Sequence, residues 1–237
     1  MVVQYNQQTQ FMKNTVKIIV SILLLSGCSS NISKVEDILL PFSGIEFSKS
    51  INDASKHCEI DNNRLSLQGV SGTNYFNAPD GSRKESSAPI LLMEIDNNRP
   101  FTFTTKLQTE IGHTYDAGAL FIYMDNNDWL KYAFELDEKG RRRIVTVRTR
   151  SSSDDNNHDI INQDFVYLKI SSNIKQIGFY YSLDGTNWNM ARLFKNEYST
   201  KLWLGVSSQS PGGKGNMTHF EEMSLTFDPV TNFRLGR

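Results

Sequence analysis

The chain has 237 residues, a formal net charge of -1 and a hydrophobic fraction of 38%. Nucleic-acid binding requires a concentrated basic surface, which this charge balance does not predict, so we expect no nucleic-acid partner. The chain is long enough to bury a core without metal ions or disulfide bonds, and its composition is that of a globular protein.

The N-terminal residues have the pattern of a bacterial secretory signal. Lys13 and Lys17 precede an apolar run at residues 18–25, which is far shorter than the roughly 20 residues of a membrane-spanning helix. The run ends in Leu25-Ser26-Gly27-Cys28, which resembles the lipobox of bacterial lipoproteins. We therefore expect a signal peptide over residues 1–27 and a lipid on Cys28. An ordinary signal peptide with an incidental cysteine is the alternative.

Lipidation at Cys28 predicts a location in the cell envelope, on the extracytoplasmic side of a membrane to which the lipid anchors the chain. Ser29 and Ser30 follow the cysteine, without the Asp that commonly retains lipoproteins at the inner membrane. An outer membrane is therefore the expected site where the host has one. Met12 stands directly before the basic residues, and either Met1 or Met12 can be the true start.

Beyond the signal, residues 28–55 are polar apart from a short apolar patch at residues 38–42, which predicts a tether leading into the domain. From residue 56 to 237 the pattern is that of strands separated by turns, with no linker. The expected strands are residues 64–69, 101–108, 119–124, 130–136, 143–150, 165–170, 176–181, 202–206 and 223–227. Strands at this spacing indicate one all-β domain, an antiparallel sandwich or barrel.

Several motifs follow one another in a specific order between residues 67 and 227. They are residues 72–81, Asp116-Ala117-Gly118, Trp129-Leu130-Lys131 with Glu135, residues 145–150, Ser182-Leu183-Asp184-Gly185 with Trp188, and residues 205–211. Together they resemble the bacterial domain of unknown function 1349 family, also called regulation of enolase protein 1-like. The resemblance implies a concanavalin A-like jelly-roll sandwich of two antiparallel sheets. It implies no single function, because this fold serves lectins, hydrolases and scaffolds.

Strand alternation predicts which side chains of residues 129–136 lie together. The apolar even-numbered residues share one face, which we expect to be the core, while Trp129, Lys131 and Glu135 share the other. An indole beside charged groups is a common way to bind a sugar, because the ring packs on the pyranose and the charged groups bind its hydroxyls. A solvated sheet face held by cross-strand ion pairs is the alternative.

The same rule of alternation applies to the strand that follows. Val145 and Val147 are expected to face the core, and Arg148 and Arg150 to lie on the face of Lys131. Three polar residues at strand ends are expected at the rim, where their alternative role is to cap turns. The predicted ligand-binding residues are Trp129, Lys131, Glu135, Arg150, Asp116, Asp154 and Gln209.

Catalytic and metal-binding patterns are weak. Glu94-Ile95-Asp96 resembles the start of a glucanase acid motif, but Asn98 stands where its last acid should be, and a hydrolase needs two carboxylates. The polar runs at residues 125–128 and 154–157 lack the calcium-loop pattern and are interpreted as turns, and the histidines lack metal-ligand spacing. We expect no catalytic residue, metal or cofactor. The predicted function is non-catalytic carbohydrate binding; a glycoside hydrolase-like enzyme and a structural or protein-binding envelope lipoprotein are the alternatives.

Overall fold

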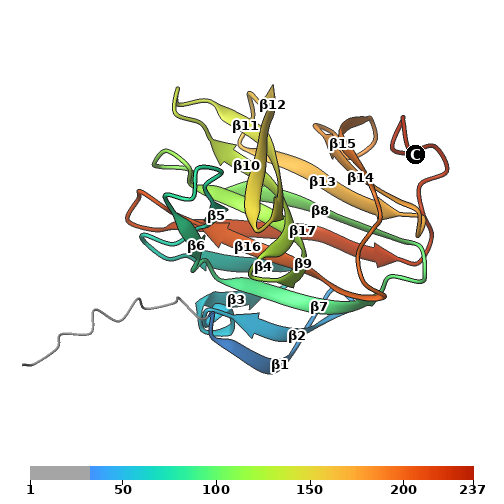
Figure 1. The fold of residues 1–237 in the computed structure, drawn as a ribbon, viewed down its shortest axis with the longest axis horizontal. Coiled ribbons are helices and arrows are strands. Elements are labelled where there is room, and N and C mark those ends of the chain that lie inside the picture. The colour runs from blue at the N-terminus through green and yellow to red at the C-terminus, as the bar shows by residue number, and fades with distance from the viewer. Residues whose placement is uncertain (1–32) are drawn as a thin grey trace, which may run out of the picture. The chain divides into compact units, whose positions relative to one another are not determined.

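The computed structural model describes residues 33–237. The expected signal peptide and Cys28 lie outside the described residues. Within those residues no helix is long and apolar enough to cross a membrane. The described chain is built almost entirely of strands that form two large antiparallel sheets and a small hairpin (Figure 1).

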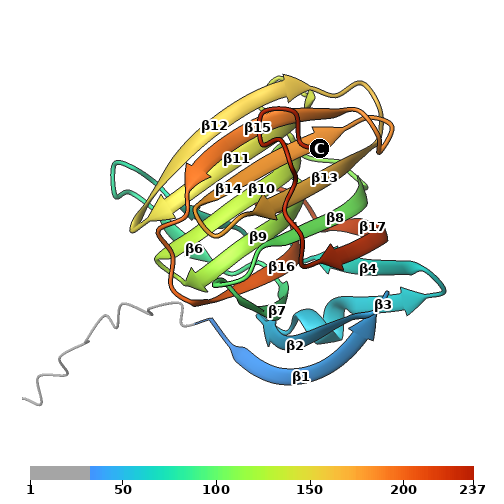
Figure 2. The same cartoon turned by 90° about the vertical axis from the view of Figure 1, so that its right-hand side faces the viewer.

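The eight-stranded sheet contains, in spatial order, β1 (Val35–Phe42), β2 (Ile45–Ile51), β7 (Ile90–Asp96), β16 (Lys201–Gln209), β9 (Ala117–Asp125), β10 (Asp128–Leu136), β11 (Arg142–Arg150) and β12 (Ser152–Ile160). The seven-stranded sheet contains β15 (Trp188–Lys195), β14 (Gln176–Ser182), β13 (Phe165–Ser172), β8 (Phe101–Thr109), β17 (Asn216–Thr226), β4 (Arg64–Gly69) and β3 (Cys58–Asp61). A hairpin is formed by β5 (Tyr75–Asn77) and β6 (Lys84–Ser86), and a short 3-10 helix, η1, spans Ala54–His57. Figure 2 shows β1 and β12 at opposite edges of the eight-stranded sheet.

The main core lies between the two large sheets. In β8 every second residue is buried, so that Phe101, Phe103 and Leu107 point into the core, while Thr102, Thr104 and Lys106 are partly exposed. This alternation is the pattern that predicted the strand, and burying one face of each sheet is what holds a sandwich together. The predicted all-β jelly-roll sandwich is confirmed.

The sandwich begins earlier in the sequence than expected. Residues 28–55 were predicted as a tether, but β1 and β2 within them pair with each other, and β2 also pairs with β7. Phe42, Ile45 and Phe47 are buried in the main core. The structure therefore corrects the expected boundary at residue 56. The apolar patch at residues 38–42 was the signal, but the exposed Leu39 is apolar like its partly buried neighbours and so hides the alternation of the strand.

The polar run at residues 154–157 is not a turn. It lies in β12, the edge strand next to β11, and β12 is exposed along most of its length. An edge strand that carries polar side chains on both faces shows no hydrophobic alternation, and so it cannot be recognised by periodicity.

The hairpin between β10 and β11 fixes the register of the strands that carry the site. Asp137 is buried and accepts hydrogen bonds from the backbone nitrogens of Lys139 and Arg141, both at 2.9 Å, and from Arg143 Nε at 3.1 Å. Burial acts to raise the pKa of Asp137, but these partners outweigh it and hold the pKa well below its usual value. Gly140 supplies the positive φ of 71° that the turn requires.

Candidate functional site

Strand β10 divides its side chains between two faces as alternation predicted. Leu130, Tyr132 and Phe134 belong to the main core between the sheets. Trp129 and Lys131 lie on the opposite side, here called the outer face of the eight-stranded sheet. The predicted division of this strand is therefore confirmed, but the outer face is not a simple solvated surface.

Trp129 lies under the β5–β6 hairpin instead of in an open groove. Its side chain is 0% exposed, and its ring centroid lies 5.8 Å from that of Tyr75 on β5 and 5.7 Å from that of Phe121 on β9. These three rings and Tyr123 are called the Trp129 cluster. Burying an indole removes a large apolar surface from water, so a covering segment is favoured over an exposed ring. The expectation that Trp129 is exposed and stacks on a sugar is wrong.

Lys131 is the next outward residue of β10 and is also buried, at 3% exposure. Its Nζ donates hydrogen bonds to the backbone oxygen of Tyr75, at 3.0 Å, and to Oε1 of Gln209, at 3.3 Å. Burial lowers the pKa of Lys131, and the negative charges of Glu135, Asp155 and Glu85 partly oppose this. The structure thus brings Lys131 and Gln209 together. Gln209 is itself fully buried and does not form an exposed rim.

Glu135 ends the outward series of β10 and is half-buried. Burial raises its pKa from 4.5 to about 7, with the Lys131 charge acting in the opposite direction and Asp155 adding to the rise. A carboxyl group with this pKa changes its charge near neutral pH. Such groups are concentrated in functional sites, because binding and proton transfer both use them.

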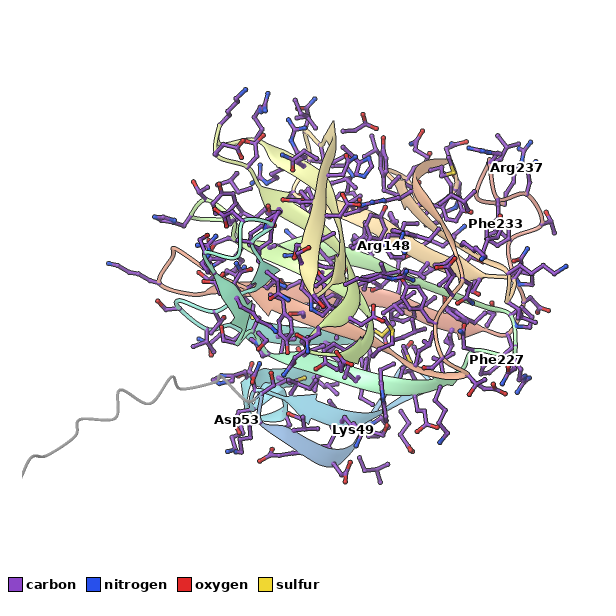
Figure 3. The ribbon with its side chains drawn as sticks, in the orientation of Figure 1. Lys49, Asp53, Arg148, Phe227, Phe233 and Arg237 are labelled. Carbon is purple, nitrogen blue, oxygen red and sulfur yellow. The ribbon has the colours of Figure 1, made fainter. Side chains whose placement is uncertain are left out.

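The side chains of β11 face the opposite way from the prediction. Val147 is paired with Lys131, and Val145 with Ala133, so both valines lie on the outer face. Arg148 and Arg150 lie on the other side; Figure 3 shows Arg148 between β12 and the part of the molecule that holds β15. The strand was misassigned because its apolar residues were assumed to face the main core, whereas the outer face is also covered here.

Arg150 and Asp154 are consequently remote from Lys131. Arg150 is exposed and forms an ion pair with Glu197 at 3.2 Å. Asp154 is paired in register with Arg148 and forms an ion pair with Arg192 at 2.9 Å. Arg150 was predicted on the face of Lys131 and Asp154 at the rim of the groove. Both predictions are wrong, because the odd-numbered residues of β11 and their partners on β12, rather than the even-numbered ones, share the face of Lys131. The neighbouring Asp155, opposite Val147, occupies the outer face instead.

Asp116 anchors a loop and is 1% exposed. Its carboxylate accepts hydrogen bonds from the backbone nitrogens of Gly112 and His113, at 3.1 and 2.8 Å, and from Ser210 Oγ at 2.7 Å. These contacts agree with the turn-capping alternative and leave Asp116 no exposed oxygen for a ligand. The neighbouring Tyr115 is 45% exposed and has a positive φ of 69°, which is uncommon for a bulky residue and persists only where the surroundings enforce it.

A pocket of about 270 Å³ opens on the outer face beside the Trp129 cluster. Its walls come from the β5–β6 hairpin and the residue before it, from β10, β11 and β12, and from the loop before β9, and its floor includes the two valines of β11. The lining residues of this outer-face pocket are Asn74, Phe76, Arg83, Tyr115, Lys131, Glu135, Val145, Val147 and Asp155. The pocket thus combines two aromatic rings with an apolar floor and several hydrogen-bonding groups, which is a suitable lining for a small polar molecule.

Two predicted residues, Lys131 and Glu135, line this pocket, and sequence analysis missed Tyr115, Phe76 and Asp155. The motif at residues 72–81, with adjacent aromatic residues between two glycines, was the available signal for the β5–β6 wall. Glu94 lies elsewhere, exposed and in an ion pair with Lys201 at 2.9 Å. Within residues 33–237 no three His, Cys, Asp or Glu side chains gather in a way that could hold a metal ion.

Several solved structures have the same fold. A functionally unknown protein from Saccharomyces cerevisiae gives a TM-score of 0.69 at 20% identity, covering 76% of this chain and 95% of that one. The xyloglucan PUL GH43B protein from Bacteroides ovatus gives a TM-score of 0.61 at 12% identity, and the match covers 83% of this chain and 39% of that one. The GH43 BlXynB protein from Bacillus licheniformis gives a TM-score of 0.60 at 16% identity, and the match covers 77% of this chain and 36% of that one. This chain therefore corresponds to less than half of either GH43 protein, and these identities establish the fold alone.

No curated protein sequence matches the chain. A sequence family described as Protein of unknown function (DUF1349) matches residues 51–227, which is more than half of the chain. The match includes the hairpin, β10, β11 and β12, and hence every strand that lines the outer-face pocket. The resemblance inferred from the ordered motifs is confirmed: this chain belongs to the DUF1349 family.

Proposed function

We propose that the protein is a non-catalytic carbohydrate-binding module and that the outer-face pocket is its binding site. The observation that carries this proposal is the pocket lining, in which the exposed ring of Tyr115 stands beside Glu135, Asp155 and Asn74. An aromatic ring packs on the apolar face of a pyranose, and the polar side chains bind its hydroxyl groups. Tyr115 thus takes the role that was first assigned to Trp129.

The strained backbone of Tyr115 supports this role. Asp116 fixes the loop through Gly112, His113 and Ser210, and the backbone nitrogen of Tyr115 donates to the oxygen of Leu136 at 2.8 Å. A bulky residue in a left-handed conformation costs of order 1–3 kcal/mol, which the surrounding contacts must offset. Holding an exposed aromatic ring in this way positions it in advance for a ligand.

A glycoside hydrolase-like activity is the second candidate, favoured by one observation. Glu135 has a pKa of about 7 and shares the pocket with Asp155, and a raised carboxyl beside a second carboxyl is the arrangement that a glycosidase requires. We rank it below binding because the electrostatic effect of Lys131 opposes the rise in the Glu135 pKa, and because the similarity to the GH43 proteins covers less than half of their length.

A glycan array combined with a polysaccharide hydrolysis assay tests the proposal. Binding without turnover, lost in Tyr115→Ala and retained in Asp154→Asn, is the expected result. Asp154 is a matched control because it lies on the adjacent position of β12 and faces the other side. Turnover that disappears in Glu135→Gln would establish the hydrolase instead. Neither binding nor turnover would favour a structural or protein-binding role in the envelope.

We also propose that the mature chain is a lipoprotein, anchored through Cys28 on the extracytoplasmic side of a membrane, and of the outer membrane in a host that has one. The basic residues, the short apolar run and the Leu25-Ser26-Gly27-Cys28 motif support this proposal. Growth with a fatty-acid analogue should label the protein, and Cys28→Ala should abolish the label. An unlabelled parent protein would contradict the proposal.

A further inference from the structure

The outer-face pocket contains two carboxylates that no neighbouring group neutralises directly. Among residues 33–237, neither Glu135 nor Asp155 forms an ion pair, and Asp155 accepts a hydrogen bond from the backbone of Asn156. Glu135 is half-buried, and its pKa is raised chiefly because burial weakens its solvation, whereas Asp155 is exposed at the pocket wall. Placing a cation beside a desolvated carboxylate lowers its free energy.

The two basic residues of the pocket are already engaged. The Nζ of Lys131 donates hydrogen bonds to the backbone oxygen of Tyr75 and to the side chain of Gln209. With Glu135 and Asp155 it has only longer-range charge interactions. Arg83 lies 3.5 Å from the Glu85 carboxylate, and its guanidinium is 5.7 Å from the ring centroid of Phe76. The groups available to a ligand are therefore predominantly acidic.

The aromatic rings of the pocket also favour a positively charged ligand. The face of an aromatic ring carries a negative partial charge, which attracts a cation within about 6 Å. The ring of Tyr115 is 45% exposed at the pocket. A ligand that combines an ammonium group with an apolar ring face would thus contact both kinds of group at once.

We propose that the outer-face pocket binds a sugar that carries a protonated amine, with Glu135 and Asp155 holding the ammonium group and Tyr115 packing on the sugar ring. This inference rests on the proposed glycan-binding function. The volume of about 270 Å³ is at the small end of ligand pockets, and so suits a single sugar ring. A metal ion would need more ligands than these two acids supply.

Matched oligosaccharides test the proposal with the full protein. Each sugar on the panel is presented in three forms, with a free amine, an N-acetyl group or a hydroxyl at C2, and binding is measured by calorimetry near pH 7. The free-amine form should bind at least about tenfold more tightly than the other two forms. Asp155→Asn and Glu135→Gln should each reduce that preference, whereas Asp154→Asn should leave it unchanged.

The variants separate recognition in the pocket from general attraction between an acidic protein and a basic sugar. Asp154→Asn and Asp155→Asn remove the same charge from neighbouring positions on opposite faces of β12, so equal losses would overturn the proposal. Equal or tighter binding of the N-acetyl or hydroxyl forms would also overturn it while leaving the glycan-binding function in place. No binding of any form would count against both. Melting temperatures verify that each variant is folded.

Discussion

The outer face of the eight-stranded sheet has two halves along β10, one covered by the hairpin and one open to solvent as a pocket. In the Trp129 cluster, β10 packs under the hairpin and its indole is sealed from water. Two and six residues further along the same side of the strand, Lys131 and Glu135 line an open pocket. The first half consists of aromatic rings in contact, and the second of charged groups whose pKa values burial has shifted.

The difference shows how a stable fold accommodates an unfavourable site. The hairpin contributes the ring of Tyr75 to the sealed half. The backbone oxygen of Tyr75 accepts a hydrogen bond from Lys131, and the next residue, Phe76, lines the open half. Apolar burial in one half therefore offsets the cost of desolvating charged groups in the other. Substitutions in the two halves should therefore have different consequences. Those in the sealed half should lower the stability of the fold, and those in the open half should weaken ligand binding.

The largest effect is expected from Trp129→Ala. Removing a fully buried indole leaves a cavity under the hairpin, and we expect a loss of about 3–5 kcal/mol in the free energy of unfolding. Denaturant unfolding measures this loss. Trp203→Ala is the control, because Trp203 is only partly buried beside the same cluster, and its loss should be smaller. A Trp129→Ala protein as stable as the parent would show that the ring does not support the hairpin.

A smaller loss is expected from Asp116→Ala. The change leaves the backbone nitrogens of Gly112 and His113 and the hydroxyl of Ser210 without their acceptor, which should cost about 2–3 kcal/mol. Hydrogen exchange should accelerate at those two amides. Asp154→Ala, which removes an exposed ion pair with Arg192, should cost at most about 1 kcal/mol. Equal losses in the two variants would mean that Asp116 does not anchor the loop.

The effect of Glu135→Gln should depend on pH. The folded pKa of about 7 lies above the ordinary value of 4.5, so the folded chain holds this proton more tightly than the unfolded chain. Stability that is fully present below pH 4.5 is therefore lost as the pH rises through 7. Between pH 5 and pH 8 the parent should lose about 1–2 kcal/mol relative to Glu135→Gln, after allowance for partial solvation. Parallel stability profiles would contradict a raised pKa.

Much of the fold could be predicted because strands such as β8 place an apolar residue toward the core at every second position. β8 and β10 alternate regularly, and their predicted bounds and faces agree with the structure. β12 could not be predicted, because an edge strand with polar residues on both sides carries no alternating signal. β1 was missed because the exposed Leu39 stands between the partly buried Ile38 and Leu40, so that a regularly alternating strand shows an unbroken apolar run in the sequence.

The site was predicted only in part, for a related reason. Lys131 and Glu135 were found because they share a face of one strand, and alternation within one strand is a local property. The orientation of β11 depends on which of its faces is covered, and the hairpin covers Val145 and Val147 from a distance in sequence. The strained φ of Tyr115 depends on the Asp116 contacts, and no pattern in the sequence shows it.

The central claim, that ligand binds in the open half, is tested most directly by Tyr115→Gly. Glycine adopts the positive φ of 69° without strain, so the variant should be as stable as the parent to within about 1 kcal/mol. It also lacks the ring that packs on the sugar, so calorimetry should show at least about a tenfold loss of affinity for the glycan that the parent binds. Unchanged affinity in this folded variant would contradict the account and place the ligand elsewhere.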